Sequence, residues 1–217
     1  MKKIIFLVTA VSMLAAGCAT MNKQQKRTAA GAAGGALIGA AVSGGSVWGV
    51  LIGAAVGGTA GNLIGKKMDK QAKELKQAIP TAEVERVGEG INVTFSSGLM
   101  FTINSAEISD SYKDDLAAAA GVFKNNPETN ILVEGHTDDT GSDEVNMNLS
   151  QKRAEAVSAF LQSNGIDASR LQTKWYGESQ PKYANDGDEN RQKNRRVELA
   201  VYANEDMKTK AKDGKLE

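Results

Sequence analysis

The sequence of 217 residues contains few of the side chains that bind metals or form disulfides. It has one cysteine, Cys18, and one histidine, His136. An intramolecular disulfide, a cysteine-based zinc cluster and a multi-histidine metal site are therefore excluded. We expect neither a metal site nor a cofactor from the remaining residues.

Acidic residues are absent from residues 1–65, which carry five basic residues and hence a charge of +5. The 21 basic and 26 acidic residues that remain give residues 66–217 a charge of −5. Non-specific nucleic-acid binding requires a cationic surface, so this acidic balance argues against a nucleic acid as partner.

The first 17 residues have the pattern of a signal peptide. Lys2 and Lys3 precede an uncharged run over residues 4–16, which is too short to span a bilayer. The run ends in Leu14-Ala15-Ala16-Gly17-Cys18, and small residues before a single cysteine resemble the lipobox of bacterial lipoproteins. The resemblance implies that Cys18 becomes the first mature residue and carries acyl chains, palmitate among them. Ala19 follows Cys18, whereas Asp at that position favours inner-membrane retention in the lipoprotein family, so the resemblance implies the outer membrane.

Residues 18–27 form a short linker to an uncharged segment, residues 28–65, in which glycine recurs every fourth residue. This spacing places the glycines along one ridge of a helix, where another helix can approach closely. Residues 43–46 interrupt the pattern as a turn, which predicts a helical hairpin. The segment resembles the glycine zippers of bacterial envelope proteins. The two glycine series are Gly31, Gly35 and Gly39, then Gly45, Gly49, Gly53, Gly57, Gly61 and Gly65.

Membrane insertion or homo-oligomerisation of this hairpin would offset the cost of glycine in a helix, about 1 kcal/mol each. A flexible Gly/Ala linker is the alternative interpretation. Residues 66–81 are polar and favour a stalk helix that stops at Pro80.

Residues 82–203 predict one compact α/β domain. The expected order is strand, helix, strand, helix, strand, strand, with the helices packed on a mixed sheet as an α+β sandwich. The charged tail over residues 204–217 is expected to be disordered. Strands are expected at 82–87, 91–95, 131–135, 170–175 and 196–202, with 98–101 as a continuation of the second, and helices at 109–125 and 149–164.

Four motifs in this domain occur in a fixed order. They are G-H-T-D-x-x-G at 135–141, N-x-x-L-S-x-x-R-A at 146–154, G-x-x-x-P at 177–181 and N-R-R-V-E at 194–198. Their order and spacing resemble the C-terminal domain of the OmpA family, a peptidoglycan-binding module, over about residues 101–202.

The resemblance implies that the ligand is diaminopimelate in the stem peptide of peptidoglycan. The side-chain end of this amino acid is a zwitterion, so a site for it needs a fixed carboxylate beside a fixed guanidinium. By resemblance, Asp138 accepts the ammonium and Arg153 binds the carboxylate. Thr137, Asn146 and Asn104 match positions that shape the pocket. Arg195 shares a strand face with Val197 by period two, which makes it a further pocket candidate, with a structural ion pair as the alternative.

Two other chemistries are considered for the same loop. A hydrolase could use His136 with Asp138 or Asp139, but no nucleophile has a recognisable elbow. A calcium loop would use Asp138, Asp139, Asp143 and Glu144, but Thr140 stands where a ligand is required. A stator-like proton channel would need a membrane carboxylate, which residues 28–65 lack.

The sequence thus predicts a non-enzymatic outer-membrane lipoprotein that ties the membrane to peptidoglycan, with its domain facing the periplasm. The alternative is an envelope stress or assembly factor that acts through the glycine zipper and uses the wall domain as an anchor.

Overall fold

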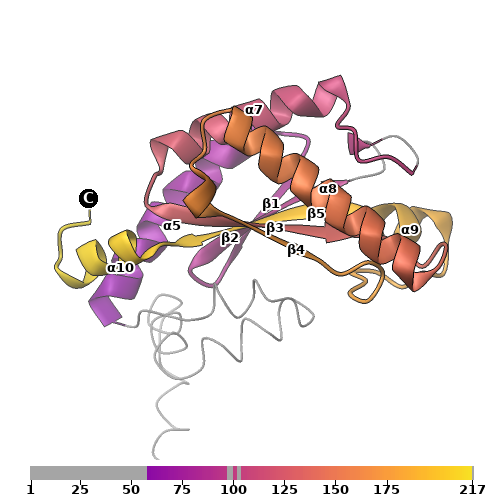
Figure 1. Ribbon diagram of the computed structural model, residues 1–217. Coiled ribbons are helices and arrows are strands. Elements are labelled where there is room, and N and C mark those ends of the chain that lie inside the picture. The colour runs from indigo at the N-terminus through magenta and orange to yellow at the C-terminus, as the bar shows by residue number, and fades with distance from the viewer. Residues whose placement is uncertain (1–57, 97–99, 102–103, 217) are drawn as a thin grey trace, which may run out of the picture.

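A five-stranded mixed sheet organises the described part of the chain, which comprises residues 58–96, 100–101 and 104–216 of a computed structural model (Figure 1). The strand order is β1-β2-β5-β3-β4, in which β3 and β4 are parallel and the other neighbours are antiparallel. The C-terminal strand β5 therefore lies in the centre and separates the first hairpin from β3. The strands are β1 (Glu83–Val87), β2 (Gly90–Ser96), β3 (Thr129–His136), β4 (Leu171–Trp175) and β5 (Arg196–Ala203).

Helices cover one face of the sheet, and α5, α7 and α8 lie on the same side of it (Figure 1). Alternate residues of the central strands, such as Val133 and Leu199, are fully buried in the core beneath them. Parallel β3 and β4 are joined through α8, as a parallel crossover requires. The helices are α5 (Gly58–Ala78), α7 (Asp110–Asn125), α8 (Asp143–Ser163), α9 (Asp188–Asn194) and α10 (Glu205–Lys212), with a 3₁₀ turn η1 (Ala168–Arg170) before β4.

The prediction of a stalk over residues 66–81 differs from the structure in two ways. Helix α5 begins eight residues earlier, at Gly58, and it packs on the domain. Ile64, Met68 and Leu75 recur at helical spacing and are fully buried against the core. The helix is therefore part of the folded unit. Residues 28–57 of the predicted glycine-zipper hairpin lie outside the described residues.

The prediction of a disordered tail over residues 204–217 is wrong for residues 204–216. Helix α10 begins after Asn204, whose side chain accepts a hydrogen bond from the Met207 N–H at 2.9 Å. Met207, Ala211 and Leu216 are buried in the same core and pack near α5. Most residues of this segment are polar or charged, so its few apolar residues did not indicate a packed helix in the sequence.

Most of the expected strands and helices occur within two residues of their predicted ends. Helix α8 begins six residues early because Ser142 caps it, and a seven-residue helix, α9, replaces part of the loop predicted over 178–192. Phe101 forms an isolated antiparallel bridge with Ile108, while residues 97–99 lie outside the description. Among the described residues, no helix combines the length and the apolar character needed to cross a bilayer.

Candidate functional site

The loop after β3 holds Asp138 in a fixed orientation. The Thr137 N–H donates to the Gly177 carbonyl at 2.9 Å, which ties the end of β3 to the segment after β4. Asp138 is 4% exposed, and its Oδ1 accepts the Thr140 N–H at 3.0 Å. The Asp138 side chain thus closes a short turn, and its carboxylate lies just beyond the C-terminal end of β3.

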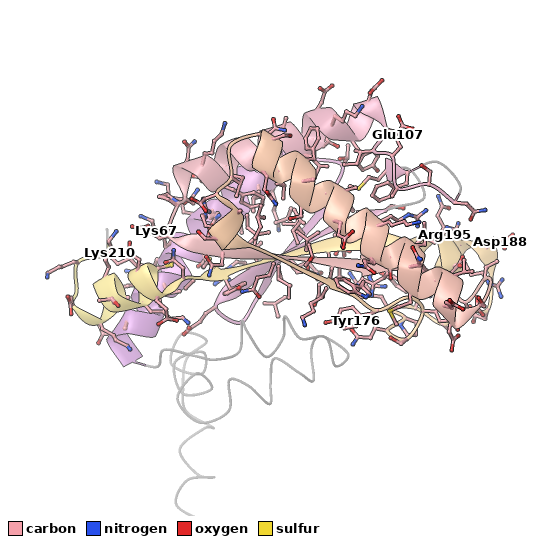
Figure 2. The ribbon with its side chains drawn as sticks, in the orientation of Figure 1. Lys67, Glu107, Tyr176, Asp188, Arg195 and Lys210 are labelled. Carbon is pink, nitrogen blue, oxygen red and sulfur yellow. The ribbon has the colours of Figure 1, made fainter. Side chains whose placement is uncertain are left out.

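Arg195, which lies 57 residues after Asp138 in the sequence, contacts this carboxylate. Its Nη1 lies 2.5 Å from Asp138 Oδ2, and about a third of its side chain is exposed. The strand-face argument does not apply to Arg195, because β5 begins at Arg196 and Arg195 lies in the α9–β5 connection. In Figure 2 it lies beside the end of the sheet where α8 begins. Its contact with Asp138 is an ion pair, and a role in binding stays a prediction.

Arg153 lies on α8 and is 4% exposed. Its Nε donates to the Ser105 carbonyl at 3.1 Å, and its guanidinium lies 5.0 Å from the Phe101 ring centroid. Burial, followed by the positive charge of Arg195, lowers the pKa of Arg153 to about 10, while the Asp138 carboxylate opposes this change. Arg153 therefore interacts electrostatically with both members of the Asp138–Arg195 pair.

The site therefore combines one buried carboxylate with two guanidiniums of different exposure. Arg153 is fixed against an aromatic ring and a backbone carbonyl, whereas Arg195 is more exposed and bonded to Asp138. One carboxylate and two guanidiniums give the site a formal charge of +1. An anionic group would gain from this environment, and an accompanying ammonium would compete with Arg195 for Asp138.

The other predicted residues differ in their relation to this centre. Asn146 is 2% exposed, and its amide donates to the Asp138 carbonyl at 3.2 Å and to Glu178 Oε2 at 2.6 Å. Thr137 is buried, and its hydroxyl has no hydrogen-bond partner among the described residues. Asn104 is exposed with a φ of 56° in the turn before Ser105, so it shapes the segment that holds Arg153.

The backbones of the first three motifs lie very close to one another. This packing was not predicted from the sequence. A Cβ at Gly135 would lie 2.1 Å from the Ser150 carbonyl oxygen, so α8 rests directly on β3. Gly177 has a φ of 54°, and its N–H donates to Ser150 Oγ at 3.0 Å. The glycines and the serine of the motifs are the signal that could have indicated this packing.

A second ion pair reinforces the loop. Asp139 Oδ1 accepts from Arg191 Nε at 2.9 Å, and the Arg191 Nη2 donates to the Asn185 carbonyl at 2.9 Å. Since Asp138 and Asp139 both bind arginines, the loop differs from a calcium loop, whose acids must point at a cation. His136 is 1% exposed and burial lowers its pKa well below the ordinary value, which is unsuitable for a base that must reach a substrate.

Comparison with protein families identifies two matches. The model of the OmpA family matches residues 100–195, and that of the YMGG-like Gly-zipper matches residues 1–69. The probable lipoprotein YiaD of Escherichia coli K12 is 34% identical over 216 residues, which is 93% of this chain and 99% of that protein. A peptidoglycan-associated lipoprotein of Haemophilus influenzae is 38% identical over 100 residues, 46% of this chain and 65% of that protein.

Solved structures agree on the fold. A putative MotB-like protein from Desulfovibrio vulgaris has a TM-score of 0.61 at 24% identity, covering 66% of this chain and 95% of that one. The cell wall anchor of a type VI secretion system from Pseudomonas aeruginosa has a TM-score of 0.55 at 27% identity, covering 63% of this chain and 97% of that one. The family is non-enzymatic, in agreement with the sequence prediction. The chain belongs to the OmpA family and carries a Gly-zipper of the YMGG type before its α/β domain.

Proposed function

We propose that the domain binds peptidoglycan without covalent attachment, by gripping the zwitterionic end of diaminopimelate in the stem peptide. Asp138 receives the ammonium and Arg153 the carboxylate, while Arg195 contributes to the same pocket. The observation that carries this proposal is the juxtaposition of one buried carboxylate with two guanidiniums at the sheet edge. The names of the Haemophilus lipoprotein and of the Pseudomonas anchor support the same ligand class.

The two arginines have different parts in this proposal. Arg153 is already oriented by Phe101 and Ser105, so it loses little freedom when a carboxylate binds. Arg195 occupies Asp138 in the unliganded protein, and the ligand ammonium takes its place or shares the carboxylate. The ligand carboxylate then binds both Arg153 and the displaced Arg195 guanidinium, so each charged group in the pocket keeps a partner of opposite sign.

The membrane end of the tether is proposed from the sequence. An acylated Cys18 would hold the chain in the outer membrane, and the domain would face the periplasm and the wall. Simultaneous attachment at both ends raises the effective concentration of the domain near peptidoglycan, so modest affinity at the site is sufficient. Radiolabelled palmitate incorporation in the wild type and in Cys18→Ala tests this part, and equal labelling of the two would contradict it.

Titration with purified muropeptides tests the site. Fragment 58–217 is appropriate because α5 and α10 belong to the core. Asp138→Asn and Arg153→Lys retain most of the packing, and each should weaken binding about thirtyfold or more, which corresponds to about 2 kcal/mol for a charged partner lost from a buried contact. Asp143→Asn is the matched control, since Asp143 is an exposed acid in the first turn of α8.

Binding of a muropeptide without diaminopimelate at wild-type affinity, or unchanged binding by both site variants, would contradict the assignment. A pull-down on purified sacculi with the same four proteins measures the corresponding loss on the intact wall.

The Gly-zipper match over residues 1–69 favours a second candidate function, in which the zipper acts in envelope stress or outer-membrane assembly and the domain serves as its anchor. Deletion of residues 28–57 separates the two, because it keeps both Cys18 and the packed helix α5. If cells that carry the deletion keep the wild-type phenotype, the simple tether is supported. If they lose it while the protein still binds sacculi, the zipper function is supported.

A further inference from the structure

Three potential metal ligands gather on the sheet face opposite the three large helices. Glu134 and His136 are alternate residues of β3, and Glu198 lies directly across from Glu134 on β5. They are 0%, 1% and 3% exposed, respectively. One ligand atom from each residue can be chosen so that all three lie within 4.8 Å of one another. This arrangement is separate from Asp138 and Arg153, although His136 precedes the binding loop by two residues.

His136 indicates that this cluster receives a ligand. Both of its ring nitrogens are buried and have no hydrogen-bond partner within residues 58–96, 100–101 and 104–216, which is costly for a polar group in a low-dielectric interior. Its ring is held by stacking on Tyr176 at 5.2 Å between centroids, and its Nε2 lies 4.0 Å from Glu134 Oε2.

Neighbouring side chains orient the two carboxylates from outside the cluster. The Tyr176 hydroxyl donates to Glu134 Oε1 at 3.0 Å, and the Asn92 amide donates to Glu198 Oε2 at 3.0 Å. Arg196 Nε lies 2.5 Å from Glu198 Oε1. Hydrogen bonds that fix ligating carboxylates are a general feature of metal sites, and each carboxylate oxygen keeps a second lone pair for a metal.

The charges of the cluster also suit a divalent ion. Glu134 and Glu198 bring two formal negative charges and Arg196 brings one formal positive charge. The Lys182 ammonium is bonded to Glu83 at 3.0 Å; burial opposes the rise in its pKa, which the bond to Glu83 and the charges of Glu83 and Glu198 produce. Desolvation of two carboxylates is expensive, and a bound cation between them would offset that cost.

We propose that Glu134, His136 and Glu198 bind one divalent transition-metal ion, with Zn²⁺ as the ion that the donor set favours. One imidazole nitrogen and two carboxylate oxygens are ligand types that zinc binds, and a water would occupy the fourth tetrahedral position. Tetrahedral bonds of about 2.1 Å require ligand atoms roughly 3.4 Å apart, so glutamate rotations of about 1 Å complete the site. The ion would fix the end of β3 immediately before Thr137 and Asp138. This site does not depend on the proposed wall binding.

Metal titration of the full-length protein in detergent tests the proposal. All proteins carry Cys18→Ser, so that the thiol cannot bind metal, and are first stripped with a chelator. At Zn²⁺ one hundred times above its dissociation constant, the Tm should rise by roughly 5–10 °C. Co²⁺ in place of Zn²⁺ should produce the visible absorption of a tetrahedral site, with one ion per chain.

Three variants locate the ion. Glu134→Gln and His136→Gln should abolish both the Co²⁺ absorption and the Zn²⁺-dependent rise in Tm. Asp143→Asn, at an exposed acid in the first turn of α8, should retain both. Glu134→Gln keeps an oxygen that can accept from Tyr176, so it is expected to fold even if His136→Gln does not. A wild type that shows neither signal, or an equal response in the folded Glu134→Gln protein, would overturn the proposal. Muropeptide binding measured on the same samples reports independently on the wall site.

Discussion

Substitution of Gly135 by alanine is the strongest test of how the first two motifs are held together. The added Cβ would lie 2.1 Å from the Ser150 carbonyl oxygen and 2.9 Å from its carbonyl carbon. Real Cβ contacts are almost never closer than 3.0 Å, so β3 and α8 must separate by about 0.9 Å. Both partners are backbone atoms of packed elements, so no side chain can rotate to relieve the contact.

The expected cost is about 3 kcal/mol of unfolding free energy, at the upper end of the range for overpacking a core. Urea denaturation of fragment 58–217 measures it as a lower midpoint with an unchanged m-value. Gly121→Ala is the matched control: it lies within α7, and an added Cβ there meets nothing within 4 Å. That variant should gain about 0.5–1 kcal/mol, because alanine favours the helix.

The same displacement should weaken muropeptide binding, because α8 carries Arg153 and β3 leads to Asp138. A shift of about 0.9 Å in their separation disturbs a site that must be held to about 0.5 Å. If Gly135→Ala changed stability by less than about 0.5 kcal/mol, the proposed direct contact between β3 and α8 would be refuted.

Three further predictions concern contacts beyond the binding pair. Truncation after residue 203 removes the buried Met207 with α10 and should cost about 2–4 kcal/mol, visible as a lower Tm, whereas a disordered tail would cost nothing. Arg170→Met should destabilise by about 1–3 kcal/mol in urea denaturation, since Arg170 donates to three backbone carbonyls between α7 and β3; an unchanged midpoint would argue against those bonds. Arg191→Gln and Asp139→Asn should each weaken muropeptide binding severalfold, because the two residues form one ion pair. The double variant should bind no more weakly than either single variant. Additive losses would show that the pair does not act as a unit.

The sequence alone predicted most of the sheet and two helices, because hydrophobic periodicity is local and strong there. Val197, Leu199 and Val201 alternate along one strand, and all three are fully buried in the structure. The resemblance of its motifs to the OmpA family also selected Asp138 and Arg153 as site residues, and their role in binding stays a prediction.

The tertiary structure decided what these charges contact. Arg195 is 57 residues from Asp138 along the chain, and its position beside that carboxylate depends on the central placement of β5. The alternation rule could not give this result, because Arg195 precedes the strand. The packing of α5 and α10 was hidden for a related reason. Each helix has a narrow apolar stripe that stabilises the fold only when a partner covers it. Its burial is therefore a property of the assembled core. The alternating pattern of a strand, in contrast, is already visible in the isolated segment.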